Sequence, residues 1–174
     1  MQIERRLTQE LRADERQELL TLCALAYEEA LEPYLGWIGH GLHLFVRDGA
    51  DMVSHLMIVE RVLQPAERPA LRTGYIELVA THPEWQGRGY ASALLRASAK
   101  ELDAFELGAL SPSDAAFYTR LGWETWRGPL MVRTGHGVVP TPDEEIMIRR
   151  TARTPAWLSV DVSLSCEWRE GEVW

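Results

Sequence analysis

The chain has 174 residues, 46% of them hydrophobic and 25% charged, a composition typical of a folded globular domain and not of a disordered chain. The formal net charge of −8 disfavours nucleic acid as a partner, because Lys and Arg contacts to phosphate supply much of the affinity for it, but it is compatible with a cationic small molecule. Because the sequence shows neither a signal peptide, a membrane-spanning segment nor metal-type cysteine spacing, we expect a single cytoplasmic domain over residues 1–174 with no metal and no membrane contact.

The first third of the chain predicts a strand and then a helix. Residues 3–7 form a candidate strand, and apolar residues at helical spacing predict a helix from Ala13 to Ala30, with Cys23 on its buried face. Pro33 and Gly36 break this helix, and we expect at most a short helical turn after it.

A hairpin and a central strand come next. Apolar residues alternate over residues 42–46, and Asp48-Gly49 favours a tight turn into a partner strand at about residues 52–63. A surface loop then leads to a mostly buried strand over residues 73–81.

A second helix follows the central strand. We expect it over Tyr90–Leu102, followed by a strand at residues 105–110 and a short helix at residues 113–121 that ends at Gly122. Short strands and loops make up the rest. This order of elements is typical of a mixed α/β fold with one crossover unit.

The most informative segment runs from Val79 to Ala91, where a buried strand enters a turn that opens a helix. Unpaired backbone N–H groups and the helix dipole make a helix start a good site for a diphosphate. Gly87 and Gly89 let the backbone approach phosphate closely, and Arg88 adds a charged donor. A P-loop would need Gly-Lys-Ser/Thr and a dinucleotide fingerprint a third glycine, and the segment has neither.

The spacing Gln86-x-x-Gly89-x-Ala91 resembles the coenzyme A pyrophosphate loop of the GNAT acetyltransferases. The resemblance implies the GNAT (acyl-CoA N-acyltransferase) fold, an α/β fold in which helices flank a mixed, mostly antiparallel central sheet. It also implies acetyl-CoA as the cosubstrate, with the Val79 N–H polarising the thioester carbonyl. A plain strand-to-helix turn is the alternative. The cofactor-binding residues implied are Val79, Thr81, Gln86, Gly87, Arg88, Gly89, Tyr90 and Ala91.

Two residues are candidates for acid–base catalysis. Glu77 is the one charged residue in an apolar strand, and the family places a glutamate at the corresponding position, so it is our candidate general base. Tyr118, followed by Gly122-Trp123, matches the tyrosine that GNAT enzymes often carry as the acid for the departing thiolate. The alternatives are a surface glutamate and a core tyrosine. Cys166 has no histidine near it in sequence, which disfavours a cysteine nucleophile.

Towards its C-terminus the chain resembles the aminoglycoside 2′-N-acetyltransferases. The resemblance rests above all on the terminal pattern Cys166-Glu-Trp-Arg followed by Gly-Glu-Val-Trp174. It implies an aminoglycoside acceptor, acetylated at the 2′-amine, and a homodimer. The implied acceptor-binding residues are Glu29, Glu32, Ser111, Asp143, Glu144, Glu172 and Trp174 through its α-carboxylate.

Carboxylates suit an acceptor that carries several ammonium groups, because each pair forms a charge-assisted hydrogen bond. The indole rings of Trp123, Trp126, Trp168 and Trp174 offer flat surfaces for sugars. Each single acid could instead be a solvated surface charge. A GNAT enzyme for a polyamine, a small metabolite or a protein N-terminus, and a non-catalytic acyl-CoA-binding module, remain open as alternatives.

Overall fold

The computed structural model describes residues 1–29 and 31–174, apart from the side chain of Glu32. The chain divides into two compact units: the first unit holds residues 1–59 and 76–99, and the second unit holds residues 60–75 and 100–174. Strands β3 (Asp51–Pro65) and β4 (Leu71–Thr81) each contribute to both units. The single domain expected from the sequence stays a prediction.

Three antiparallel strands organise the first unit. β1 (Ile3–Leu7) pairs with β2 (Gly41–Asp48), and β2 pairs with β3. The predicted hairpin is confirmed, with Asp48 opposite Asp51 and Gly49 at a φ of 63°. Residues 52–59 of β3 are all buried, so this stretch is covered on both faces and any polar side chain in it needs an internal partner.

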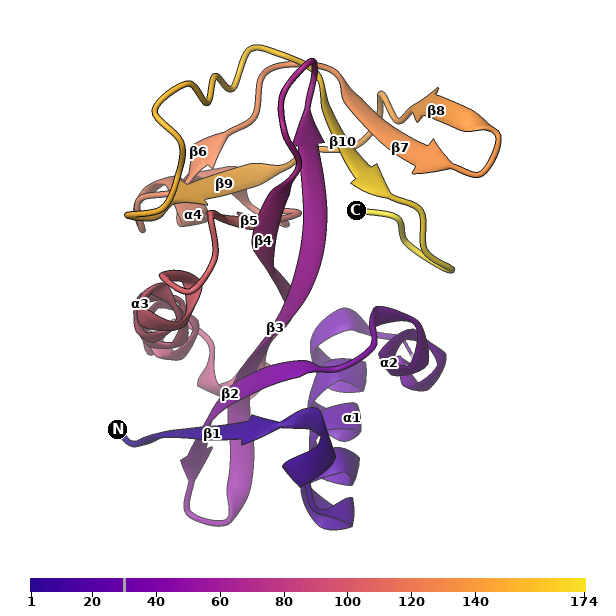
Figure 1. The fold of residues 1–174 in the computed structure, drawn as a ribbon. Coiled ribbons are helices and arrows are strands. Elements are labelled where there is room, and N and C mark those ends of the chain that lie inside the picture. The colour runs from indigo at the N-terminus through magenta and orange to yellow at the C-terminus, as the bar shows by residue number, and fades with distance from the viewer. Residues whose placement is uncertain (30) are drawn as a thin grey trace. The chain divides into compact units, whose positions relative to one another are not determined.

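Helices flank these strands. α1 (Ala13–Tyr27) and α2 (Glu32–Ile38) lie on one side of β2 and β3 in Figure 1, and α3 (Tyr90–Leu102) lies on the other. Two 3₁₀ turns, η1 (Thr8–Glu10) and η2 (Pro83–Trp85), complete the first unit. α1 ends before the predicted boundary because Glu28 takes a left-handed φ of 59°, and Ala30 lies outside the described residues.

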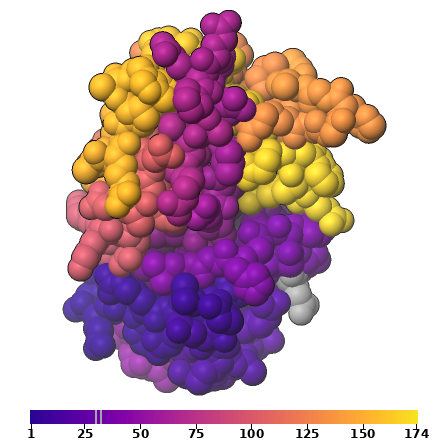
Figure 2. Space-filling view, viewed as in Figure 1, coloured from indigo at the N-terminus to yellow at the C-terminus, as the bar shows by residue number. Residues whose placement is uncertain are grey.

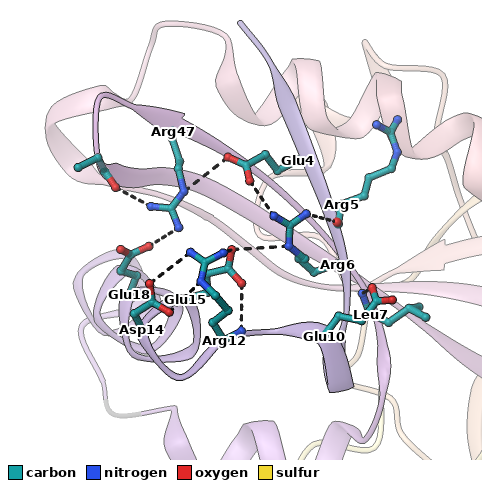
Figure 3. A network of polar contacts seen from close by, with 11 residues as sticks. Glu4, Arg5, Arg6, Leu7, Glu10, Arg12, Asp14, Glu15, Glu18 and Arg47 are labelled. Atoms are coloured by element: carbon teal, nitrogen blue, oxygen red, sulfur yellow. Dashed lines mark hydrogen bonds and ion pairs between the residues drawn. The ribbon is translucent and has the colours of Figure 1, made fainter.

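Ion pairs join β1, β2 and α1 (Figure 3). Arg47 of β2 pairs with Glu18 of α1 at 2.6 Å. The fully buried Glu15 carboxylate lies 3.0 Å from the Arg12 guanidinium and 3.6 Å from that of Arg6. Because a buried charge without a partner is costly, this pairing allows Glu15 to sit in the core beneath the first strand.

A larger set of strands forms the second unit, in the order β6-β9-β5-β4-β3-β10-β7-β8. The pairs β4–β5 and β7–β10 are parallel, whereas β5–β9, β6–β9, β3–β10 and β7–β8 are antiparallel. All residues of the edge strand β8 are exposed, and its hairpin with β7 projects in orange in Figure 2. The further elements are β5 (Leu107–Leu110), α4 (Ala115–Thr119), β6 (Glu124–Thr125), β7 (Leu130–Thr134), β8 (Gly137–Pro140), β9 (Met147–Arg150) and β10 (Leu164–Glu167).

Close packing explains two glycines in this unit. A Cβ on Gly74 of β4 would lie 2.6 Å from the Leu102 side chain, and one on Gly108 of β5 would lie 2.9 Å from it. Only glycine allows the end of α3 to pack this closely on the two strands.

Some element ends differ from the sequence-based expectations. The predicted short helix at residues 113–121 is limited to Ala115–Thr119, because Asp114 caps it by accepting from the N–H groups of Ala116 and Phe117. The predicted strand at residues 105–110 begins only at Leu107. In the described residues, no helix is long and apolar enough to cross a membrane.

Candidate active site

A backbone irregularity lies in the part of β4 that belongs to the first unit. Leu78 has a φ of 52°, a left-handed conformation that is unfavourable for a residue with a branched side chain, and it is buried. Such strained positions cost about 1–3 kcal/mol and persist only where the surroundings hold them. The two neighbours of Leu78 are Glu77 and Val79, the predicted base and the predicted carbonyl-polarising residue.

Glu77 is buried, with 7% of its surface exposed, and does not face solvent at a sheet edge. The hydroxyl of Tyr34, on α2, donates a hydrogen bond of 3.1 Å to its Oε2. A phenol that donates to a carboxylate orients it. Glu77 is thus a buried carboxylate oriented by a hydrogen bond, which suits a general base.

Side chains from α1 and β3 bind the backbone beyond the irregularity. The Tyr27 hydroxyl donates to the Val79 carbonyl at 3.2 Å. Ser54 donates to the Ala80 carbonyl at 3.1 Å and lies 2.9 Å from the hydroxyl of Thr81. Hydrogen bonds from side chains therefore hold the last three residues of β4 in place, directly before the glycine turn.

The turn presents free amides at the start of α3. Gly87 and Gly89 have φ values of 72° and 83°, and a Cβ on either would meet no atom within 4 Å. Within the described residues, the first N–H of this segment that bonds back into the helix is that of Ala93, to the Gly89 carbonyl at 3.0 Å. The preceding amides keep their donors for an external acceptor, so the turn fits a diphosphate.

Hydrogen bonds and a cation–π contact hold the residues on either side of the turn. Gln86 donates from its side chain to the Thr81 carbonyl at 3.3 Å, and the His82 N–H donates to the Val53 carbonyl at 2.9 Å. The exposed Arg88 guanidinium lies over the Trp85 ring, 5.7 Å from its centroid, and the Trp85 indole donates to Asp48 at 2.9 Å. Arg88 is thus held beside the free amides, where a second phosphate oxygen could be bound.

In the second unit, Tyr118 is buried on α4, and its ring contacts those of Phe117 and Trp123 edge to face. Burial raises the pKa of Tyr118, the Asp114 charge acts in the same direction, and a hydrogen bond with Ser113 opposes it. The phenol therefore keeps its proton throughout the neutral range, as an acid must. Its packing also fits the alternative of a core tyrosine, so its catalytic role stays a prediction.

The C-terminal segment is fixed by Arg61 of β3, which is 3% exposed. Its guanidinium donates to the Glu167 carboxylate at 3.0 Å, to the Glu167 carbonyl at 2.9 Å and to the Val173 carbonyl at 2.7 Å, and it stacks over Tyr75. Glu167 is thereby paired within the protein, and its charge is not free for an acceptor.

Trp174 is buried, and its indole donates to Thr141 at 2.8 Å. The predicted use of Trp123, Trp126 and Trp174 as flat surfaces for sugars is wrong, because all three rings are buried; Trp168 is 59% exposed. The Arg169 guanidinium donates to the terminal Trp174 oxygen at 3.3 Å.

Three of the predicted acceptor carboxylates influence one another. Partial burial, with the charges of Glu172 and Asp143, raises the pKa of Glu144. A cation near this carboxylate cluster would relieve that repulsion. Ser111 and Glu29 are exposed, and the Glu32 side chain lies outside the described residues.

Sequence reasoning missed Tyr34, Arg61 and a buried histidine, His55, which hydrogen-bonds the Leu78 carbonyl at 3.1 Å. The available signal for His55 and Arg61 was a polar residue inside an otherwise apolar strand, which demands a partner even when the partner cannot be named. Within the described residues, no group of three or more His, Cys, Asp or Glu side chains could hold a metal.

A strand with a left-handed residue that leads into a glycine turn at a helix start, with a buried glutamate beside that residue, is the arrangement expected of an acyl-CoA-dependent transferase. Residues 8–126 match the acetyltransferase (GNAT) domain family, and the chain belongs to it. It is accordingly an acetyl-CoA-dependent GNAT N-acetyltransferase with the family's mixed, mostly antiparallel sheet and flanking helices, as the resemblance of the loop implied.

Among characterised relatives, the chain is 38% identical over 140 residues to an aminoglycoside 2′-N-acetyltransferase of Mycolicibacterium fortuitum, which covers 77% of this chain and 71% of that protein. The solved structures include YhbS of Escherichia coli in complex with CoA, with a TM-score of 0.64, 16% identity and coverage of 94% of this chain and 89% of that one. A GCN5-related N-acetyltransferase of Kribbella flavida has a TM-score of 0.57 and 20% identity over 73% of this chain, which spans only 34% of its length. These structural likenesses show the fold.

Proposed function

We propose that this acetyltransferase moves the acetyl group of acetyl-CoA to an amine of an aminoglycoside, the 2′-amine in particular, by direct attack. The observation that carries the reaction class is the free-amide turn at the start of α3, next to the strand that holds the buried Glu77. The identity to the Mycolicibacterium fortuitum enzyme supports the choice of acceptor. A single domain and a homodimer are part of the proposal.

When bound, acetyl-CoA supplies an acetyl group activated as a thioester. The amides of Gly87 to Ala91 and the Arg88 guanidinium hold the diphosphate, and the Val79 N–H polarises the carbonyl. Glu77 takes the proton that the amine loses as the N–C bond forms and the C–S bond breaks. Tyr118 supplies the proton that the thiolate gains.

The carboxylate cluster of Asp143, Glu144 and Glu172 supports a polycationic acceptor. Burial, and then the charges of Glu172 and Asp143, raise the pKa of Glu144, and ammonium groups would replace that repulsion with charge-assisted hydrogen bonds. Polyamines would satisfy the same charge requirement, so the acceptor must be tested against them directly.

The acceptor is tested by measuring coenzyme A release with a matched pair of antibiotics. Kanamycin B carries an amine at the 2′ position, where kanamycin A carries a hydroxyl. We expect turnover with kanamycin B and at most a trace with kanamycin A, spermidine or a peptide N-terminus. Equal turnover of both kanamycins would contradict the 2′ assignment, and binding of coenzyme A without turnover of any amine would favour a non-catalytic acyl-CoA-binding module.

The turn itself is tested by replacing Gly89 with Ala. A side chain at a φ of 83° costs about 1–2 kcal/mol, so the turn will rearrange and the affinity for coenzyme A, measured by calorimetry, is expected to fall by about tenfold. Gly49→Ala is the matched control, because Gly49 also has a positive φ and open space but lies in the β2–β3 hairpin. It should carry a similar backbone cost and keep the affinity for coenzyme A. Unchanged affinity in Gly89→Ala would contradict diphosphate binding by this turn.

A further inference from the structure

The strained residue of β4 is bound from inside the first unit by a buried histidine. His55 of β3 is fully buried, and its Nδ1 lies 3.1 Å from the carbonyl oxygen of Leu78. A carbonyl oxygen only accepts, so Nδ1 of His55 carries the proton in this hydrogen bond. The residue with the left-handed φ, Leu78, thus accepts a hydrogen bond from the imidazole of His55 through its carbonyl oxygen.

A second histidine continues the chain of hydrogen bonds. The Nε2 of His55 lies 2.9 Å from Nδ1 of the buried His43, and Nε2 of His43 lies 3.1 Å from the hydroxyl of Thr8. In a neutral His55, Nε2 accepts, which makes Nδ1 of His43 the donor and its Nε2 the acceptor from Thr8. The Thr8 hydroxyl also accepts from the Gly41 N–H at 2.9 Å, and its single proton is shared between Nε2 of His43 and the Gly41 carbonyl, which lies 3.1 Å away.

Both imidazoles are neutral at physiological pH. Burial, aided by the charge of Arg16, lowers the pKa of His43 to about 4. Burial and the neighbouring His43 lower the pKa of His55 to about 3. The hydrogen bonds therefore run in one direction, from Thr8 through His43 and His55 to the Leu78 carbonyl.

This direction matters for the following amide. In a planar trans peptide the C=O of Leu78 and the N–H of Val79 point in opposite directions. An imidazole that fixes the carbonyl also fixes the direction of the N–H, which the proposed function assigns to the thioester carbonyl. Because a fixed donor needs no reorganisation during the reaction, its orientation affects the rate more than the affinity.

We infer that His55, supported by His43 and Thr8, is a positioning residue that orients the Val79 N–H for catalysis. The inference rests on the proposed role of that amide. Packing alone does not explain these buried polar side chains, because apolar side chains of similar size would fill the same space without needing hydrogen-bond partners. A role in orienting the Val79 N–H does explain them.

The test compares His55→Leu with His55→Asn. The leucine removes the donor, whereas the asparagine amide can place an N–H near the position of Nδ1. For His55→Leu we expect kcat to fall by about 10- to 100-fold, less than the 10²–10³ lost when an oxyanion donor is removed altogether, with unchanged affinity for coenzyme A. His55→Asn should retain most of the wild-type kcat. Leu56→Val, a buried change on the same strand, controls for loosened packing and should keep kcat.

A spectroscopic readout separates orientation from stability. The carbonyl stretch of bound acetonyl-CoA, a ketone analogue that cannot transfer an acetyl group, should lie at lower frequency in the wild type and in His55→Asn than in His55→Leu. Equal frequencies and equal kcat in all three would overturn the inference. A wild-type protein that neither binds coenzyme A nor acetylates any amine would instead overturn the proposed function.

A measurement on the unaltered protein remains decisive if His55→Leu does not fold. Long-range ¹H–¹⁵N spectra report which ring nitrogen of each histidine is protonated. We expect Nδ1–H and unprotonated Nε2 for both His43 and His55 at neutral pH. Protonation of His55 on Nε2 would leave the Leu78 carbonyl without this donor and would overturn the inference.

Discussion

Glu77→Gln is expected to lower kcat by about 10²–10⁴-fold, the contribution typical of a positioned general base. The amide is isosteric with the carboxylate, and its oxygen can still accept the hydrogen bond from Tyr34, so the fold and the affinity for coenzyme A should be unchanged. Steady-state coenzyme A release and calorimetric binding measure the two quantities separately.

The control for this variant is Glu60→Gln. Glu60 is an exposed glutamate of β3 that pairs with the exposed Arg72, and solvent screens such a surface pair. The kcat of Glu60→Gln should match that of the wild type. If Glu77→Gln keeps a kcat within about threefold of the wild type, the general base must be sought elsewhere, because even a modest base contributes more than that.

Arg61→Met is expected to destabilise the second unit and to release the C-terminal segment. The part-buried carbonyls of Glu167 and Val173 lose their donor, at about 1–3 kcal/mol each, so the free energy of unfolding should fall by about 3 kcal/mol. Chemical denaturation measures this loss. Digestion with a carboxypeptidase, followed by mass spectrometry, should show Trp174 and Val173 removed far faster than in the wild type.

Arg72→Met is the matched control, because Arg72 also pairs with a glutamate and stacks on an aromatic ring but is exposed. Because solvent screens this exposed ion pair, Arg72→Met should leave the free energy of unfolding nearly unchanged and the C-terminus protected. Equal digestion rates for Arg61→Met and the wild type would show that Trp174 and Thr141 hold the segment without help from Arg61.

Local sequence signals were enough to predict much of the fold. The bounds of α3 match the expected Tyr90–Leu102, since its apolar face and the preceding glycines mark both the helix and its start. The Asp48-Gly49 turn was found for the same reason, because a short-range preference determines it. The position of Glu77 also marks it as a site candidate, since a lone charge in an apolar strand points to a special role, and its side chain is buried.

The features that were missed depend on residues far apart in the chain. Nothing near Leu78 predicts its left-handed φ, which is accompanied by a hydrogen bond from His55 on another strand. Arg61 meets Glu167 across more than a hundred residues, so no local pattern could have paired them. The burial of the Trp174 ring is likewise not predictable, because the neighbouring residues in the sequence carry no sign of the distant partners that cover it.

The burial of both cysteines has a practical consequence. Cys23 and Cys166 are the only thiols of the chain, they are 1% and 0% exposed, and burial raises the pKa of Cys23 to about 12 and that of Cys166 to about 11. Neither forms the thiolate that attacks a disulfide dye at neutral pH. A chromogenic dye such as Ellman's reagent should therefore report the free coenzyme A thiol continuously in each assay, with little background colour from the folded enzyme.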